Sequence, residues 1–276
     1  MKKFIRIMAL VLVAVLALGA FAACSGKDDN GDTTVAADDT TAAADGTTAA
    51  ASDKVYKVVA DNSFAPFDFL DEATNTYTGI DMDLLAAIAE DQNFKYEVDN
   101  CGWTAALGNL SGGLADGMIA GMTINEERLE SYDFTDAYFE DGQIMFQKEG
   151  GALTSFEDLQ GKKIAAKNGT MGAKYAESIK DQYGFTIEIF DSSDTVYAAV
   201  LEGNVDAGIE DYSVINYRIA SSDLKLATFG EKVNVGPYGL AVLKGTNPEL
   251  ISMFNAGLTN IKANGKYAEI LAKYGM

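Results

Sequence analysis

One arginine stands in a stretch that is otherwise acidic and apolar, DGMIAGMTINEERLESYDF (116–134). Arg128 follows a glycine, Gly121, and a hydroxyl, Thr123, in a chain with 41 acidic and 21 basic side chains. A guanidinium offers a planar fork that fits a carboxylate and stays charged at any working pH. Arg128 could therefore bind the carboxylate of a small ligand. The alternative is a surface ion pair with a nearby acid, namely Glu126, Glu127, Glu130 or Asp133.

The composition excludes several other kinds of chemistry. The chain has no histidine, which rules out histidine metal ligands and both Ser-His-Asp and Cys-His nucleophiles. Besides Cys24 there is one cysteine, Cys101, which we interpret as a small core residue, with a reactive thiol as the alternative. The acidic balance argues against nucleic acid as a partner. We expect no metal and no cofactor.

The N-terminus has the pattern of a secretory signal. Lys2, Lys3 and Arg6 precede an apolar run, and small residues lead to Cys24. A permanent membrane-spanning helix, the alternative, needs about 20 apolar residues and a stop-transfer pattern. The residues around Cys24 resemble the lipobox of bacterial lipoproteins, so we predict a signal peptide over 1–23 and a lipid on Cys24. An anchored chain would then lie outside the cell, on the outer face of the membrane.

The segment 24–52 is acidic and nearly free of large apolar side chains, which predicts a disordered tether. After it, β-rich segments alternate with helical patterns. Strands are expected at 55–60, 94–100, 117–122, 162–167, 185–190 and 205–211, and helices within 78–94 and at 104–115, 171–184 and 195–204. In the first helix, Asp81 or Asp83 is the expected cap. This alternation predicts an α/β fold with mainly parallel sheets, helices on both faces, and a ligand at the carboxyl ends of the strands.

A weak internal repeat points to two lobes of similar construction. In both copies a helical segment is followed by Gly-x-x-Asp, once at 113–116 and once at 203–206, and then by a strand of small residues. The first copy leads to Thr123 and Arg128, and the second leads to Asp211. Two such lobes would face each other across a cleft whose walls carry opposite charges.

A set of motifs, in order and spacing, resembles the extracellular solute-binding proteins of ABC importers for polar amino acids. The motifs are SFAPFDF, TGIDMDLLAAIA, LADGMIAGMTINEER, YDFTDAYFEDGQ, LQGKKIAAKNGT, VDAGIEDY and YGLAVLKGTNPELISMFNAGLTNIKANGKYAEILAKYG. The resemblance covers 55–276. It implies a two-lobed periplasmic-binding-protein fold (type II), with lobe 1 over 53–138 and 239–276, lobe 2 over 143–235, and hinge crossings at 139–142 and 236–238.

The resemblance also assigns roles to the two ends of an amino acid. Arg128 would bind the α-carboxylate, while Gly121 and Thr123 would accept hydrogen bonds from the α-ammonium. Asp211 would pair with the same ammonium from the second lobe; a helix N-cap is its alternative role. The main-chain N–H groups of Thr170 and Met171 would bind the carboxylate at a helix start.

Three further residues would surround the ligand's side chain. Phe64 and Trp103 match the aromatic pair that sandwiches its stem, with ordinary core packing as the alternative. Asp61 resembles the position that contacts the distal polar group, and it could instead cap the loop that follows it.

The implied function is the substrate-binding component of an ABC importer, which hands a polar amino acid to permease subunits and is not an enzyme. We expect a monomer. The ligand stays open: Gly121 and Met122 favour glutamine or another neutral polar amino acid, Asp61 favours arginine or lysine, and cystine also fits. A dehydratase-like enzyme and an amino-acid-sensing receptor domain are the alternatives on the same fold.

Overall fold

The computed structural model describes residues 54–222 and 224–276. The expected signal peptide, the acidic tether and the lipidation site Cys24 all lie outside the described residues. Within the described residues, no helix has both the length and the apolar character that crossing a membrane requires.

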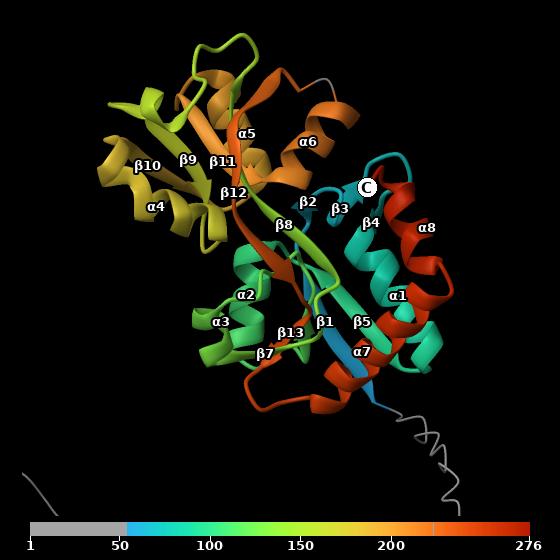
Figure 1. Cartoon of the computed structure of the whole chain (residues 1–276). Coiled ribbons are helices and arrows are strands. Elements are labelled where there is room, and N and C mark those ends of the chain that lie inside the picture. Colours follow the sequence, from blue (N-terminus) through green and yellow to red (C-terminus); the bar gives the residue numbers. More distant parts are fainter. Residues whose placement is uncertain (1–53, 223) are drawn as a thin grey trace, which may run out of the picture. The chain divides into compact units, whose positions relative to one another are not determined.

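The first five-stranded sheet is built from both ends of the described chain (Figure 1). Its order is β5-β1-β6-β13-β7. β1 pairs in parallel with β5 and β6, and β13 pairs antiparallel with β6 and β7. The bounds are β1 (Val55–Ala60), β5 (Lys95–Asn100), β6 (Gly117–Met118), β7 (Tyr132–Phe134) and β13 (Ala241–Leu243). A late segment, β13, therefore completes the sheet that β1 begins.

Both faces of this sheet are covered, because neighbouring residues of β1 point to opposite sides. Val58 packs with helices α1, α7 and α8, whereas Val59 packs with α2. These helices are α1 (Ile80–Gln92), α2 (Trp103–Ser111), α7 (Pro248–Ala263) and α8 (Lys266–Lys273), and a short α3 (Glu126–Ser131) leads into β7. A small antiparallel sheet of β2 (Ser63–Phe64), β3 (Asp68–Asp71) and β4 (Thr76–Thr78) precedes α1.

The second five-stranded sheet has the order β10-β9-β11-β8-β12. β9 is parallel to β10 and β11, and β8 is antiparallel to β11 and β12. Its strands are β8 (Phe139–Lys148), β9 (Lys163–Lys167), β10 (Thr186–Phe190), β11 (Ala207–Asp211) and β12 (Leu226–Tyr238). Its helices are α4 (Met171–Tyr183), α5 (Ser193–Glu202) and α6 (Tyr212–Ser221), with a 3₁₀ turn, η1 (Phe156–Leu159). Two apolar clusters flank this sheet, so the predicted α/β class is confirmed, with mixed sheets.

Two long strands connect the two sheets. β8 and β12 pair along most of their length, from Lys148 opposite Leu226 to Phe139 opposite Tyr238, and Figure 1 shows them running out of the second sheet toward the first. The expected crossings at 139–142 and 236–238 coincide with the paired ends of these strands. Their action as hinges, and the lobe boundaries, remain predictions.

The internal repeat corresponds to equivalent contacts in the two sheets. In the first, Asp116 N donates to Lys57 O (2.7 Å) and Lys57 N donates to Asp116 Oδ2 (2.9 Å). In the second, Asp206 N donates to Lys163 O (2.9 Å) and Lys163 N donates to Asp206 Oδ2 (2.9 Å). Each aspartate thus fixes the entry to one strand, which explains why the Gly-x-x-Asp pattern recurs.

Some local expectations were wrong. α1 begins at Ile80 after Gly79, and neither Asp81 nor Asp83 caps it. Asp81 is buried, and its Oδ2 accepts a hydrogen bond from Gly121 N (2.8 Å), a tertiary contact that no local pattern reveals. The helix expected over 104–115 ends at Ser111, and the strand expected over 117–122 ends at Met118.

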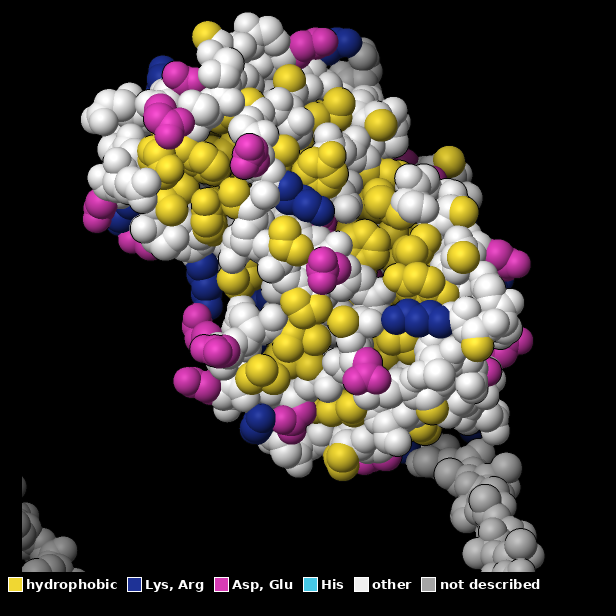
Figure 2. Space-filling view, in the orientation of Figure 1, with side chains coloured by type: hydrophobic (Ala, Val, Ile, Leu, Met, Phe, Trp, Pro, Cys, Tyr) yellow, Lys and Arg dark blue, Asp and Glu magenta, His cyan; other side chains and the backbone are white. Residues whose placement is uncertain are grey.

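The face drawn in Figure 2 shows acidic and basic side chains interspersed among clusters of apolar ones, without a continuous basic region on the described residues seen there.

Candidate functional site

One small buried cavity is lined by residues from both sheets. Its volume is about 20 Å³. The wall on the side of the first sheet consists of Phe64, Trp103, Ala120, Gly121, Thr123 and Arg128. The opposite wall consists of Lys167, Thr170, Met171, Glu210 and Asp211. All the ligand-contacting residues expected from the sequence lie here except Asp61, which forms an ion pair with Lys167 of the wall.

Arg128 is placed by the first turn of α3. The helix is capped by Asn125, whose Oδ1 accepts from Arg128 N (2.8 Å). Arg128 is only 7% exposed, and its guanidinium donates from Nη1 to Thr123 O (2.9 Å) and from Nη2 to Gly169 O (3.3 Å). Burial lowers the pKa of Arg128, and the charge of Asp211 opposes that shift.

The surface ion pairs weighed for Arg128 do not form among the described residues. Glu127 pairs instead with Lys174 (2.6 Å), and Asp133 pairs with Lys244 (2.8 Å). A buried guanidinium that contacts two carbonyl oxygens and no carboxylate retains the capacity to bind an anion.

Gly121 lies at a sharp bend in the wall, two residues before Thr123. Gly121 has a φ of 55°, and a Cβ at this position would collide with the ring of Phe64. Its N–H is shared between Asp81 Oδ2 (2.8 Å) and Tyr138 Oη (3.1 Å). Only glycine combines this dihedral with such close packing, so the main chain itself forms the cavity surface here.

Asp211 ends β11 and faces the cavity from the second sheet. It occupies the N-cap position of α6, but its side chain makes no capping hydrogen bond. Asp211 Oδ1 accepts from Gln143 Nε2 (2.8 Å), and Oδ2 accepts from the hydroxyl of Tyr238. Burial, reinforced by the charges of Glu210 and Asp141, raises the pKa of Asp211 to about 7.

Thr170 and Met171 form the start of α4. Thr170 is the N-cap; its hydroxyl accepts from Ala173 N (3.3 Å) and donates to Lys167 O (2.8 Å). The N–H groups of the first helical turn have no intrahelical partner by geometry, so Met171 N is available to an anion. Met171 also reaches the other wall, because Asn125 Nδ2 lies 3.0 Å from Met171 Sδ.

The two aromatic side chains lie against cations. The Arg128 Cζ atom is 5.3 Å from the Trp103 ring centroid, and Lys167 Nζ is 5.2 Å from the Phe64 centroid. Such contacts are favourable when both groups are desolvated. Trp103 Nε1 is buried and meets no acceptor among the residues that the structure describes. This N–H is a spare donor on the cavity wall.

Asp61 caps the loop that follows it and also pairs with a cation. Its Oδ1 accepts from Asn62 N (2.7 Å) and Ser63 N (3.3 Å), as a loop cap does. Its Oδ2 forms an ion pair with Lys167 Nζ, which comes from the opposite sheet. Asp61 is 1% exposed and Lys167 is 3% exposed, so the pair is fully buried.

Sequence reasoning missed two residues of the second wall, Lys167 and Glu210. Lys167 ends β9, and Glu210 lies one residue before the end of β11. Glu210 Oε1 accepts from Asp211 N (3.0 Å) and Oε2 from the Tyr197 hydroxyl (3.1 Å). Burial raises the pKa of Glu210, and Lys167 opposes that shift. The signal was present: KIAAK and AGIED each place a charge at the carboxyl end of a buried strand.

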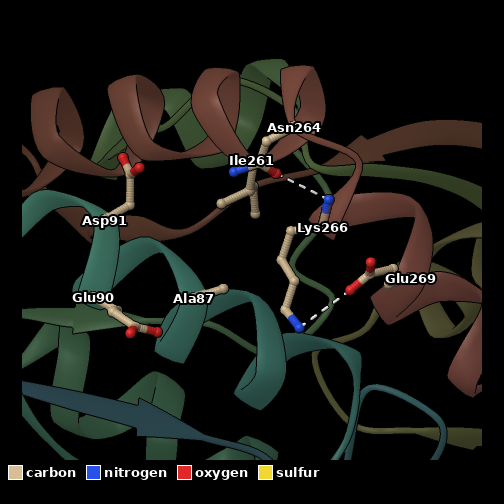
Figure 3. Close-up of a pocket in the computed structure, with 7 residues that line it drawn as sticks. All are labelled: Ala87, Glu90, Asp91, Ile261, Asn264, Lys266 and Glu269. Atoms are coloured by element: carbon tan, nitrogen blue, oxygen red, sulfur yellow. Dashed lines mark hydrogen bonds and ion pairs between the residues drawn. The ribbon is translucent and has the colours of Figure 1, made fainter.

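A larger concavity, of about 500 Å³, lies between α1 and the connection from α7 to α8 (Figure 3). Polar groups of this concavity hydrogen-bond to one another: Lys266 N donates to Asn264 Oδ1 (3.0 Å), and Lys266 Nζ donates to Glu269 Oε2 (3.3 Å). The charged side chains here are exposed. We therefore assign the candidate site to the cavity between the sheets, where buried charges converge.

Known proteins resemble this chain over nearly all of its described part. The model of the bacterial extracellular solute-binding proteins, family 3, matches residues 56–276. The ABC transporter glutamine-binding protein GlnH of Bacillus subtilis is 30% identical over 274 residues, which cover 98% of this chain and 97% of that protein.

Two solved structures add a comparison of shape. An ancestral arginine-binding protein bound to glutamine is 34% identical with a TM-score of 0.74, covering 80% of this chain and 97% of that one. Substrate-binding domain 2 of Lactococcus lactis GlnP, in its open conformation, is 40% identical with a TM-score of 0.57, covering 80% of this chain and 94% of that one.

Proposed function

We propose, for a chain that belongs to the bacterial extracellular solute-binding proteins, family 3, that it binds a polar amino acid as the substrate-binding component of an ABC importer. The observation that carries this proposal is the convergence of Arg128, from α3 beside the first sheet, and Asp211, from the end of β11 in the second sheet, on one buried cavity. An amino acid has one charge of each sign on adjacent groups. A guanidinium on one wall and a carboxylate on the other match those charges.

The two ends of the ligand are assigned by the donors and acceptors of the walls. The α-carboxylate would accept from the Arg128 guanidinium and from the N–H of Met171 at the start of α4. The α-ammonium would donate to Asp211, to the carbonyl of Gly121 and to the hydroxyl of Thr123. Because these groups come from both walls, a bound amino acid stabilises their approach.

The side chain of the ligand would meet the Asp61–Lys167 pair. Their charges cancel, so neither a cationic nor an anionic side chain gains a free counter-ion there. A carboxamide can donate to Asp61 and accept from Lys167 at the same time. A carboxylate would also face Glu210. The pair therefore favours glutamine, or a similar neutral polar amino acid, over arginine, lysine or cystine.

The arrangement corresponds to a closed form of the binding protein. The cavity has room for about one water molecule, so a ligand enters only after the walls separate. Four polar contacts between the walls would break on opening: Glu127 with Lys174, Asn125 with Met171, Asp61 with Lys167, and Arg128 with the carbonyl of Gly169. The higher TM-score to the glutamine-bound relative than to the open domain, despite lower identity, supports this reading.

The remaining parts of the proposal concern the setting of the protein. The matched family is extracellular, and we propose that residues 1–23 are removed and that lipid on Cys24 holds the mature chain on the outer face of the membrane. A monomer would then carry its ligand to permease subunits. The proposed role is binding and delivery, and we assign no catalytic step.

The test is a ligand screen on the mature chain, residues 24–276 with Cys24→Ser to prevent lipidation. Thermal unfolding is followed with each of the twenty amino acids and cystine in turn, and hits are measured by titration calorimetry. We expect glutamine to raise the midpoint and to bind with a Kd of about 1 µM or lower, near −8 kcal/mol. A chain stabilised by a sugar or a metal ion, and by no amino acid, would contradict the proposal.

A further inference from the structure

Two carboxyl groups lie side by side behind the cavity wall, and neither residue lines the cavity. Asp68 begins β3 and Asp81 stands in the first turn of α1. Both side chains are 0% exposed, and their carboxyl groups are within hydrogen-bonding reach of each other. Buried acids of this kind are rare unless something satisfies their oxygens.

The hydrogen bonds of this pair do not balance if both groups are ionised. Asp81 Oδ2 accepts from Gly121 N (2.8 Å). The other three oxygens, Asp68 Oδ1, Asp68 Oδ2 and Asp81 Oδ1, meet no donor among the described residues. An ionised carboxylate only accepts, so two of them would leave like charges buried in contact. One proton between them supplies a donor and removes one charge.

We propose that Asp68 and Asp81 share one proton, and that the pair positions Gly121 on the ligand-binding wall through the charged acceptor Asp81. The proposal rests on the proposed function only in treating Gly121 as a ligand contact. Asp81 is then a positioning residue, because it acts through the peptide that ends at Gly121 N and does not touch the ligand.

The surroundings of the pair agree with this assignment. Burial raises the pKa of Asp68 well above its usual value, with the charges of Asp81 and Asp61 adding to the shift and Lys167 opposing it. Burial likewise raises the pKa of Asp81, to about 6, while hydrogen bonds from Asp68, Gly121 and Tyr138 oppose that shift. The hydrogen bond to Gly121 N thus favours the charge on Asp81, which leaves the proton on Asp68.

Gly121 needs such an anchor because its backbone conformation is tightly constrained. Its φ is positive and the Phe64 ring fills the place of a side chain, so its position depends on what holds its N–H. That N–H meets the hydroxyl of Tyr138 in addition to Asp81. A shift of the peptide would move the carbonyl of Gly121 away from the ligand's ammonium.

The experiment compares the thermal midpoints of the mature chain and of Asp68→Asn between pH 5 and pH 8. The side-chain amide of the variant donates to Asp81 permanently, as the shared proton does. Folding of the wild type takes up a proton at Asp68, because the folded pKa is raised above the unfolded one. Its stability therefore falls relative to the variant as pH rises, by roughly 3 to 5 °C in midpoint for each pH unit.

The control is Asp99→Asn, which removes an exposed carboxyl from β5 and should shift the midpoint equally at every pH. A binding assay supplies the second readout. Asp68→Asn should keep the Kd for glutamine within about threefold, whereas Asp81→Asn should weaken it about tenfold, because Gly121 N loses a charged acceptor. A flat midpoint difference for Asp68→Asn, or equal losses of affinity in the two variants, would overturn the proposal.

If Asp68→Asn does not fold, carbon-13 NMR of aspartate carboxyl groups in the wild type decides. A coupled pair with one carboxyl still protonated at neutral pH is expected, and two independently ionised carboxyls would overturn the shared proton. A wild-type chain that binds no amino acid would refute the proposed function, while the pH comparison would still test the pair.

Discussion

Removing the cation that neutralises Asp61 should change which amino acid the protein prefers. In Lys167→Met, closure of the walls would bury the Asp61 carboxylate, since Asp61 is 1% exposed, and would leave it with only Asn62 N and Ser63 N as donors. Breaking one side of a buried ion pair costs about 3–5 kcal/mol. Because the partners come from opposite walls, this free energy destabilises the closed form and therefore lowers ligand affinity.

A ligand that brings its own cation would recover part of that cost. If the side chain of arginine or lysine recovers about 2 kcal/mol beside Asp61, the affinity ratio of arginine to glutamine rises about 30-fold. Titration calorimetry of both ligands against wild type and Lys167→Met measures this ratio. The double variant Asp61→Asn, Lys167→Met should lose the gain, because residue 61 then carries no charge for a cationic ligand to satisfy.

A matched control is Lys174→Met, which removes a lysine from an exposed pair between the same two walls. Its side chain is 39% exposed and that of Glu127 is 72% exposed, so little change in either affinity is expected. An unchanged arginine-to-glutamine ratio in Lys167→Met, or the same change in Lys174→Met, would refute the role assigned to the Asp61–Lys167 pair.

Three further predictions concern Arg128, Asp211 and Gly121. Arg128→Lys keeps the charge but loses the bidentate fork, so the binding free energy should weaken by about 1.5–3 kcal/mol. Arg128→Ala should abolish binding while the circular dichroism spectrum stays unchanged. Retained affinity in the alanine variant would remove Arg128 from the carboxylate role. The pKa of Asp211 in the closed fold is raised to about 7, and the ligand's ammonium requires the ionised form, so affinity should hold above pH 7 and decline below it. Calorimetry in buffers of different ionisation enthalpy should detect release of up to one proton per ligand near pH 6, and no release, or the same release in Asp211→Asn, would contradict this. Gly121→Ala should lower the free energy of unfolding by about 1–3 kcal/mol, because a Cβ at this positive φ would collide with the Phe64 ring. The control Gly108→Ala, at a helical position with open space around it, should be neutral or stabilising. Equal effects of the two substitutions in denaturant titrations would argue against strain at residue 121.

The class of fold was predictable because each strand and helix is indicated by the residue pattern of its own segment. The return of β13 to the first sheet followed only from the family resemblance, since no periodicity of residues 241–243 indicates which sheet they join. The Gly-x-x-Asp repeat shows the opposite case. A short pattern had the same physical cause in both sheets, the fixing of a strand entry by Asp116 or Asp206.

Among the predicted site residues, Arg128 stood out by its type in an acidic stretch, whereas the roles of the others came from the family resemblance. Lys167 and Glu210 were missed because a charge at the end of a strand is also what an ordinary exposed strand end shows. Asp81 was misread as a cap. An acid in the first turn of a helix fits that pattern, and only the tertiary contact with Gly121 N reveals its actual partner.

The buried charges explain why local patterns were insufficient. Asp61 and Lys167 lie in different sheets, so each alone would be costly to bury and only their meeting makes either acceptable. The same holds for Asp68 and Asp81, which are tolerable together through one proton. Pairings between distant segments of this kind decide the charge of the cavity, and with it the choice of ligand.

A crystal structure of the mature chain grown with glutamine tests the central claim most directly. It should show a single amino acid between the two sheets, with its carboxylate on the Arg128 guanidinium, its ammonium on Asp211, and its amide between Asp61 and Lys167. Electron density for the ligand at any other place, or an empty cavity with Arg128 and Asp211 turned outward to solvent, would contradict it.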